Sequence, residues 1–235
     1  MQSININEEL ELDFRTNEAY KTLRTNIGFC GDDIKIIAVT SCTPNEGKFS
    51  VSFNLAKSIA LAGNKVLLLD ADLRKSVLVG RYKAGKVNLG LTHFLSGQVG
   101  FEETVCTTNI PNLHMVFAGP VPPNPSELLS KKHFKALMKS LPTIYRYVII
   151  DTPPLGSVID SAVIAKECDG VVLVIESGVI SYKFAQRVKD QLIKSGSNIL
   201  GVILNKVDLS GKGYYGKYYG KYYGSYYGGQ TEEES

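Results

Sequence analysis

Short apolar runs recur along this chain and alternate with longer stretches of helical periodicity. Six runs have the length of a strand and are apolar almost throughout, as strands covered on both faces of a sheet should be. They span 35–40, 65–69, 113–117, 147–150, 171–175 and 199–204, of which 113–117 is the weakest candidate. Helical patterns occupy 18–27, 48–62, 125–140, 157–167 and 181–195. This alternation predicts an α/β fold with a mainly parallel sheet and helices on both faces.

The end of the chain breaks the pattern. Four Tyr-Tyr-Gly units repeat every four residues, separated by single Lys or Ser residues and without any aliphatic side chain. Such a segment cannot build a core, so we expect a single domain over 1–209 and a disordered tail over 210–235. Its phenol hydroxyls are candidate acceptors for a transferred group. Eight of the thirteen tyrosines stand here: Tyr214, Tyr215, Tyr218, Tyr219, Tyr222, Tyr223, Tyr226 and Tyr227.

Composition narrows the class of protein. A length of 235 residues suits one sizeable domain, and a net charge of +3 without a basic run does not indicate a nucleic-acid partner. No apolar stretch approaches the roughly 20 residues of a membrane span. The amino terminus is acidic and lacks the apolar region of a signal peptide. The four cysteines are scattered without a Cys-x-x-Cys pair, which favours a reducing cytoplasm and gives no sign of a cysteine metal site.

A candidate phosphate-binding loop follows the first predicted strand and leads into a predicted helix. Backbone N–H groups at a helix N-terminus favour anionic phosphates, Gly47 permits close approach, and Lys48 can reach the outer phosphates. A plain strand-to-helix turn that contains Gly-Lys is the alternative. The candidate nucleotide-binding residues are Pro44, Asn45, Glu46, Gly47, Lys48, Phe49 and Ser50.

Phe49 departs from what this loop needs. The position after the lysine normally carries Ser or Thr, whose hydroxyl ligates Mg²⁺, and a phenyl ring cannot do so. Ser50 lies about 100° further around the helix and is a poor substitute. We favour retained nucleotide binding with impaired chemistry. The alternative is that the ring turns aside and water fills the coordination position.

Acidic and amide side chains follow the predicted strands. Asp70 and Asp72 end one strand and Asp151 ends another, so their carboxylates should meet at the carboxyl edge of the sheet. Three converging acids beside a phosphate loop suit Mg²⁺ ligands and one general base. Asp160, just inside the next helix, is expected to cap it or balance a charge. Asn205 either contacts adenine or forms a turn.

Taken together, these motifs resemble the bacterial tyrosine kinases of capsular and exopolysaccharide synthesis, a family within the deviant-Walker P-loop ATPases. The resemblance covers nearly the whole chain and implies a P-loop NTPase-like fold. The most specific internal motif is the acidic strand end, and the tail identifies the subgroup. The matching segments are 18–26, 40–50, LLLDADLR at 67–74, GLTHFLSG at 90–97, PPNPSELL at 122–129, VIIDTPP at 148–154 and the tyrosine tail.

The resemblance implies an autokinase that uses ATP and Mg²⁺ to phosphorylate the tail tyrosines in trans. It implies that Lys48 binds the phosphates and that Asp72 and Asp151 hold Mg²⁺. Asp70 becomes the candidate base for the tyrosine proton. Asn205 becomes the adenine contact.

Partners also follow from the resemblance. Short members of the family are cytoplasmic, form rings, and are recruited to the inner face of the cell membrane by a membrane-anchored chain-length regulator that activates them. Glu18, Lys21 and Arg24, within the 1–30 region, match the motif that joins subunits, with Lys21 in place of an arginine. A solvent-facing charge stripe is the alternative. A phosphotyrosine phosphatase would reset the tail.

Three other functions stay open. A pseudokinase scaffold, phosphorylated by a sister enzyme, is consistent with Phe49. A partition-type ATPase of the same superfamily would carry a lysine where this chain has Thr43. An iron–sulfur carrier ATPase would need the Cys-x-x-Cys that the chain lacks.

Overall fold

One sheet forms the centre of the molecule. The computed structural model of the chain describes residues 2–6, 12–76 and 87–208. The predicted disorder of the tail and its eight candidate acceptor tyrosines lie outside these residues. The strands in the described part are β1 (Gln2–Ser3), β2 (Ile36–Ser41), β3 (Val66–Asp70), β4 (Cys106–Thr107), β5 (Leu113–Val116), β6 (Tyr147–Asp151), β7 (Gly170–Glu176) and β8 (Ile199–Asn205).

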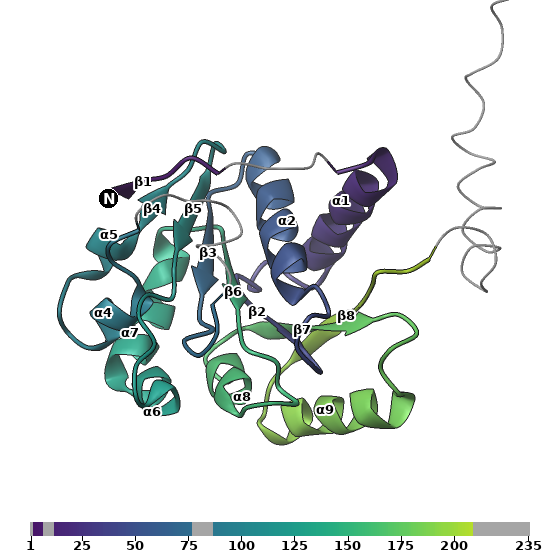
Figure 1. Ribbon diagram of the computed structural model, residues 1–235. Coiled ribbons are helices and arrows are strands. Elements are labelled where there is room, and N and C mark those ends of the chain that lie inside the picture. The colour runs from purple at the N-terminus through teal and green to yellow at the C-terminus, as the bar shows by residue number, and fades with distance from the viewer. Residues whose placement is uncertain (1, 7–11, 77–86, 209–235) are drawn as a thin grey trace, which may run out of the picture.

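The sheet is parallel through its main part. Its strands lie in the order β1-β4-β5-β3-β6-β2-β7-β8 (Figure 1). All neighbours from β5 to β8 are parallel, whereas β4 is antiparallel to β5. The predicted α/β class, with its mainly parallel sheet, is therefore confirmed.

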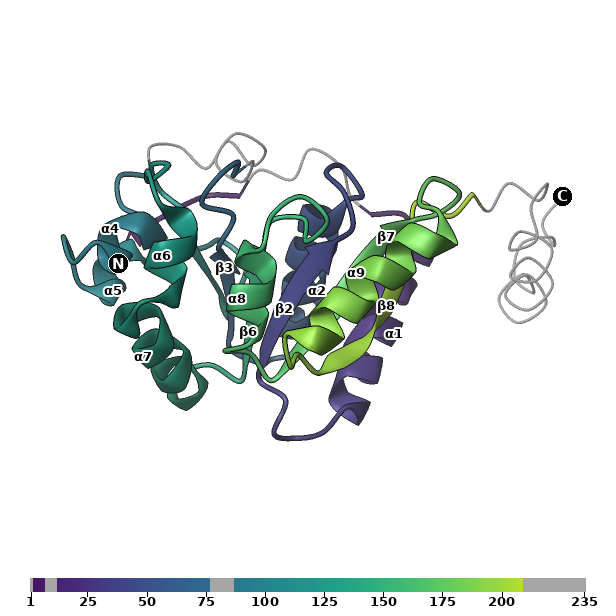
Figure 2. The ribbon, with the colours of Figure 1, turned by 90° about the horizontal axis from the view of Figure 1, so that it is seen from below.

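Helices cover both faces of the sheet, as Figures 1 and 2 show from two directions. On one face lie α1 and α2, and on the other lie α6 to α9. Two short helices, α4 and α5, flank the β4 and β5 end. The helices are α1 (Phe14–Phe29), α2 (Lys48–Leu61), α4 (Leu91–Leu95), α5 (Phe101–Thr104), α6 (Pro125–Ser130), α7 (Lys132–Ser140), α8 (Asp160–Ala165) and α9 (Tyr182–Lys194), with a 3-10 turn at Leu141–Thr143.

Alternate strand residues supply two separate cores. Ile36 and Ala38 of β2 point into the core under α6 to α9, whereas Ile37 and Val39 point into the core under α1 and α2. Because both faces of the strands are buried, the strands had to be apolar at nearly every position. This is why the strand segments were visible in the sequence.

Three helix predictions need correction. The helix expected over 125–140 is broken at Lys131, whose extended backbone (ψ 162°) separates α6 from α7. The helix expected over 157–167 begins only at Asp160 and ends at Ala165, because turns occupy the residues just before it. The helix expected over 18–27 is longer and begins at Phe14, where the Asp13 carboxylate accepts the Thr16 N–H at 2.9 Å.

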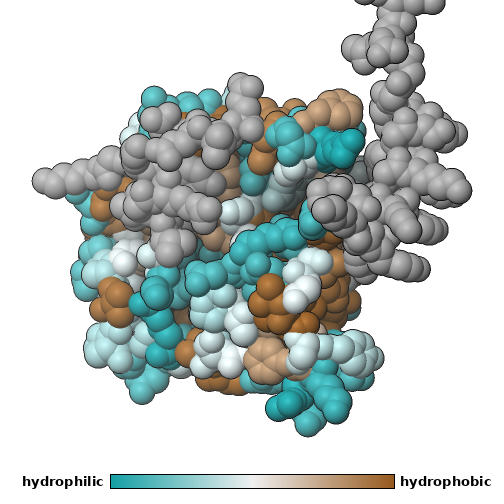
Figure 3. Space-filling view, turned by 45° about the vertical axis from the view of Figure 1, so that its right-hand side comes forward, coloured by the Kyte–Doolittle hydropathy of each residue, from teal (hydrophilic) through white to brown (hydrophobic). Residues whose placement is uncertain are grey.

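Edge strand β8 exposes apolar side chains. Val202 and Leu204 are 56% and 39% exposed. Figure 3 shows apolar surface on the side of the molecule that carries α1, β8 and α9. Among the described residues, no helix has the length and apolar character needed to cross a membrane.

Candidate functional site

The phosphate loop has the backbone that an anion cradle requires. Gly47 caps α2 with φ 82°, and Asn45 also has a positive φ, 70°. A Cβ on Gly47 would lie 2.2 Å from the Asn205 amide nitrogen, so no other residue fits without displacing that side chain. Pro44 and Asn45 are exposed at the loop tip, while Lys48 begins the helix. The N-terminus of the 14-residue α2 therefore faces the loop and favours a phosphate there.

The ends of β7 and β8 hold this loop in place. Asn205 donates its amide N–H to the Glu46 carbonyl at 2.8 Å, and the Lys206 ammonium donates to the Asn45 carbonyl at 2.7 Å. The Glu46 carboxylate is buried and accepts the Glu176 N–H at 3.0 Å. These hydrogen bonds were not predicted from the sequence, because their partners are far apart in the chain. The adenine contact of Asn205 stays a prediction.

The structure brings the three predicted carboxylates to one edge of the sheet. Asp70 and Asp151 end neighbouring strands in direct register. The Lys48 ammonium lies 2.8 Å from the Asp151 carboxylate, and both side chains are at most 10% exposed. Asp72 follows two residues after Asp70, and its carboxylate accepts the N–H groups of Arg74 and Lys75 at 3.2 and 3.0 Å.

Burial shifts the pKa of two of these acids, Asp70 and Asp151. It raises the pKa of Asp70 to about 7, with a further contribution from the negative charge of Asp151. Burial also raises the pKa of Asp151, against the opposing effect of the Lys48 ammonium. Ser76 donates its hydroxyl to Asp70 at 2.5 Å. A carboxyl group with a pKa near neutrality can accept and release a proton at working pH.

Phe49 turns away from the loop. Its side chain is 5% exposed and belongs to the core under α1 and α2, where its ring centroid lies 6.5 Å from that of Phe53. Ser50, the weak substitute considered from the sequence, is partly exposed on α2.

Ser52 contributes a buried hydroxyl group to this site. Its Oγ lies 2.9 Å from Asp151 Oδ1 and 3.0 Å from the Lys48 carbonyl. Sequence reasoning missed this residue. The signal was available, because Ser52 is four residues after Lys48 and therefore on the same face of the helix.

The oxygen atoms at this site suit a metal ion that is also bound by the phosphates of a nucleotide. Among the described residues, no group of three or more His, Cys, Asp or Glu side chains could hold a metal on its own. Mg²⁺ needs only one or two carboxylates when phosphate oxygens and water supply the other ligands. Asp72 and Asp151 offer such carboxylates, and Ser52 adds a hydroxyl oxygen beside Asp151.

Arg74 and Asp160 clamp the segment after β3. The guanidinium donates to both carboxylate oxygens, at 2.7 and 3.1 Å, and Ser126 donates to the same carboxylate at 2.5 Å. Asp160 is fully buried at the first position of α8, so it balances a charge and does not cap the helix. The clamp ties the segment that carries Asp72 to α6 and α8.

We expect Asp160→Asn to lower the free energy of unfolding by about 2 kcal/mol, because it removes a buried charge from a bidentate pair. The loss stays below that of a fully buried pair because the Arg74 side chain is 41% exposed and can reach water. Urea unfolding measures the effect. Asp190→Asn, which changes an exposed carboxylate paired to Lys189, should cost almost nothing. Equal losses in the two variants would contradict the clamp.

The predicted subunit-joining residues make contacts within the chain. Lys21 pairs with Glu18 at 2.6 Å on the exposed face of α1. Arg24 donates to the Ser58 carbonyl at 2.8 Å and so joins α1 to α2. Their role between subunits stays a prediction.

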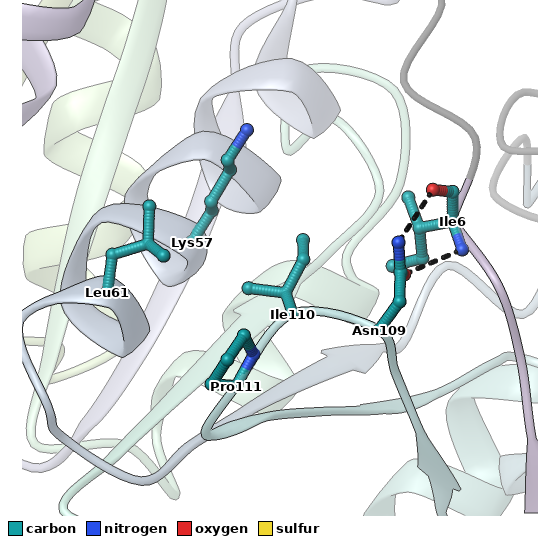
Figure 4. A pocket seen from close by; sticks show the side chains of 6 residues that line it. All are labelled: Ile6, Lys57, Leu61, Asn109, Ile110 and Pro111. Atoms are coloured by element: carbon teal, nitrogen blue, oxygen red, sulfur yellow. Dashed lines mark hydrogen bonds between the residues drawn. The ribbon is translucent and has the colours of Figure 1, made fainter.

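A pocket of about 340 Å³ lies at the opposite edge of the sheet, near the end of α2 (Figure 4). It holds none of the predicted site residues. Asn109 bonds the Ile6 backbone through both side-chain atoms, at 2.9 and 3.3 Å, which fixes the N-terminal segment there. The pocket therefore belongs to the packing of that segment.

Comparison with known proteins identifies the family to which the chain is similar. The model of the AAA domain matches residues 34–208. The chain is 46% identical over 196 residues to the tyrosine-protein kinase CpsD of Streptococcus agalactiae, covering 83% of this chain and 86% of that protein. It superposes on the kinase domain of the Escherichia coli tyrosine kinase ETK with a TM-score of 0.80 and 31% identity, over 86% of this chain and 82% of that one.

A third comparison concerns the nucleotide. The septum site-determining protein MinD of Pyrococcus horikoshii, solved in complex with Mg-ADP, matches with a TM-score of 0.63 and 26% identity, over 73% of this chain and 70% of that one. The fold is thus that of a nucleotide-binding ATPase domain.

Proposed function

This chain belongs to the bacterial tyrosine-protein kinases built on an AAA-type ATPase domain, and on that premise we propose that it transfers the γ-phosphoryl group of ATP to tyrosines of its own C-terminal segment. The observation that carries this is the meeting of Lys48, Asp70 and Asp151 beside the phosphate loop. One cation and two acids at the carboxyl edge of a parallel sheet provide the charges that phosphoryl transfer requires.

Each group has a distinct task in this mechanism. The loop N–H groups and Lys48 bind the phosphates, and the ion pair with Asp151 holds the ammonium at the start of α2. Asp72 and Asp151 would hold Mg²⁺, which neutralises phosphate charge when bound. Asp70 accepts the phenol proton as the phenol oxygen bonds to the γ-phosphorus. The bond from that phosphorus to the bridging oxygen breaks, and ADP leaves with the electron pair.

The point at which the described chain ends supports the tail as substrate. The described chain ends at Asp208, three residues after Asn205, whose amide touches the phosphate loop. The described part of the chain therefore ends at the edge of the sheet that carries the phosphate loop. We propose that it is phosphorylated in trans within a ring of subunits joined through Glu18, Lys21 and Arg24.

The biological role follows from the family. We propose that the kinase is cytoplasmic, is recruited and activated by a membrane-anchored chain-length regulator, and is reset by a phosphotyrosine phosphatase. Each phosphate adds about −1.5 to −2 charges to the tail, and the edge of the sheet that would bind the tail is already lined with Asp residues. The resulting repulsion would loosen the ring and switch the polymerisation and export of a capsular polysaccharide or exopolysaccharide.

Phosphotyrosine mapping tests the proposal. The full chain is incubated with ATP, Mg²⁺ and a cytoplasmic fragment of the activator, and its peptides are analysed by mass spectrometry. We expect phosphate on tyrosines between 214 and 227, and none on a variant with all eight changed to Phe. Labelling that persists in that variant would contradict the tail as substrate.

The phenylalanine at position 49 motivates a second candidate function, that of an ATP-binding scaffold phosphorylated by a sister kinase. The same experiment separates the two functions. An unlabelled wild-type chain beside a strongly labelled Phe49→Ser variant would favour the scaffold. The burial of the Phe49 ring favours the kinase, since the ring leaves the loop free for a nucleotide.

A further inference from the structure

A small pocket adjoins the acidic end of β3. Its volume is about 280 Å³, just below the usual range of about 300–1,000 Å³ for ligand pockets. Four of the residues that line it are apolar: Val87, Leu89, Phe117 and Pro120. Ser76, Asn88 and His93 add polar groups at its lining. An apolar slot with a polar edge suits a ring that carries one hydroxyl.

The sheet order places this pocket across the carboxylates from the phosphate loop. The loop follows β2, Asp151 ends β6, Asp70 ends β3, and Phe117 follows β5. These four strands are consecutive neighbours in the order β5-β3-β6-β2. With about 4.8 Å between strands, the pocket and the loop lie roughly 14 Å apart, on opposite sides of the acids. A phosphoryl donor and an acceptor need this opposed arrangement for in-line transfer.

Ser76 connects the pocket to the candidate base. Its side chain lines the pocket, and its hydroxyl donates to Asp70 Oδ2 at 2.5 Å. A hydroxyl group entering from the pocket would therefore meet Ser76 first and the Asp70 carboxylate directly behind it.

The 90–97 motif builds one wall of the pocket. Gly90 packs so closely on the end of β5 that a Cβ would lie 2.6 Å from the Phe117 carbonyl oxygen and the Gly119 nitrogen. Leu91 donates its N–H to the Phe117 carbonyl at 2.7 Å. His93 accepts the Gly90 N–H through Nδ1 at 3.1 Å, which leaves the proton of a neutral ring on Nε2. These contacts give the wall a fixed shape.

We propose that this pocket is the subsite for the phenol ring of the acceptor tyrosine. The inference rests on the proposed kinase activity. The apolar walls hold the ring, and Ser76 directs the hydroxyl to Asp70. The proton passes to Asp70 while the phenol oxygen bonds to the γ-phosphorus and ADP departs. Binding of the ring thus selects tyrosine over serine or threonine, whose shorter side chains would leave the slot unfilled.

Filling the pocket tests this. The parent protein is the full chain with its eight tail tyrosines changed to serine, and the acceptor is a synthetic peptide with the sequence of residues 213–220. Val87→Trp places an indole in the pocket. Val121→Trp is the matched control, because Val121 is 68% exposed and does not line the pocket. We expect Val87→Trp to raise KM for the peptide by roughly tenfold or more, with KM for ATP and the rate of ATP hydrolysis within about twofold of the parent.

A second variant and a second ligand make the result decisive. Leu89→Trp fills the same pocket and replaces Val87→Trp if that variant melts early. The peptide with Phe in place of Tyr should inhibit competitively in the Val121→Trp protein and fail to inhibit in the pocket variants. Equal peptide KM values in all variants would overturn the subsite and leave the kinase assignment intact. A parent protein that labels no peptide would overturn both.

Discussion

We expect Phe49→Ser to lower the free energy of unfolding by about 3 kcal/mol and to tighten Mg²⁺-dependent nucleotide binding by about tenfold. The stability loss follows from the burial of the ring, which is 5% exposed and packs near Phe53. Removing such a ring leaves a cavity and lost contacts. The gain in binding follows from the small serine side chain, which can turn its hydroxyl to the loop, where a P-loop Ser or Thr ligates Mg²⁺.

Urea unfolding and ADP titration with and without Mg²⁺ measure the two effects. Phe53→Ser is the matched control, because its ring is 1% exposed in the same core and lies one turn further along α2. The control should lose stability without any change in the Mg²⁺ dependence of binding. If both variants bind Mg-ADP equally well, Phe49 has no bearing on the metal site.

The structure settles the orientation of the Phe49 ring, which the sequence left open. Sequence reasoning identified the departure from Ser or Thr and left two interpretations, a weakened Mg²⁺ site or a ring that turns aside while water fills the coordination position. Apolar positions on α2 and β2 form the core that receives it, and a core is a property of the assembled fold. The preference for impaired chemistry rested on the missing hydroxyl alone. It did not take account of Ser52, whose hydroxyl lies 2.9 Å from Asp151.

The strands and the meeting of the acids could be predicted because they depend on local pattern and on one rule of topology. Strands buried on both faces must be apolar, and the carboxyl ends of parallel strands share an edge. Asp70 and Asp151 therefore had to lie at the same edge once the sheet was parallel, and the pairing of β3 with β6 places them side by side.

The supports of the site could not be predicted, because their partners are distant in the chain. Arg74 meets Asp160 across 86 positions, and Glu46 meets the Glu176 N–H across 130. No spacing rule links such pairs. The break at Lys131 was missed for another reason. Both segments carry apolar residues at helical spacing, but at about 100° per residue Leu128 and Leu129 would lie on the face of one continuous helix opposite to Leu137 and Met138, and this mismatch was overlooked.

The ion pair between Lys48 and Asp151 should be the most sensitive part of the site. We expect Lys48→Met to reduce tail phosphorylation by at least about a hundredfold, because it removes the buried ammonium that lies beside the phosphate loop and the Asp151 carboxylate. It should also lower the free energy of unfolding by about 3 kcal/mol in the absence of nucleotide. The Asp151 carboxylate would then be buried with the Ser52 hydroxyl and without its counter-ion.

A second substitution separates stability from catalysis. Asp151→Asn added to Lys48→Met removes the stranded charge and keeps a polar partner for Ser52, so the double variant should regain about 2 kcal/mol over Lys48→Met while staying inactive. Urea unfolding and phosphate incorporation measure the two properties. Lys135→Met with Glu167→Gln provides the control, since that pair is 3.6 Å apart with Lys135 52% exposed and should show almost no coupling. Strictly additive losses at Lys48 and Asp151 would mean that the buried pair holds no interaction energy, and the charge balance of the site would then have to come from other groups.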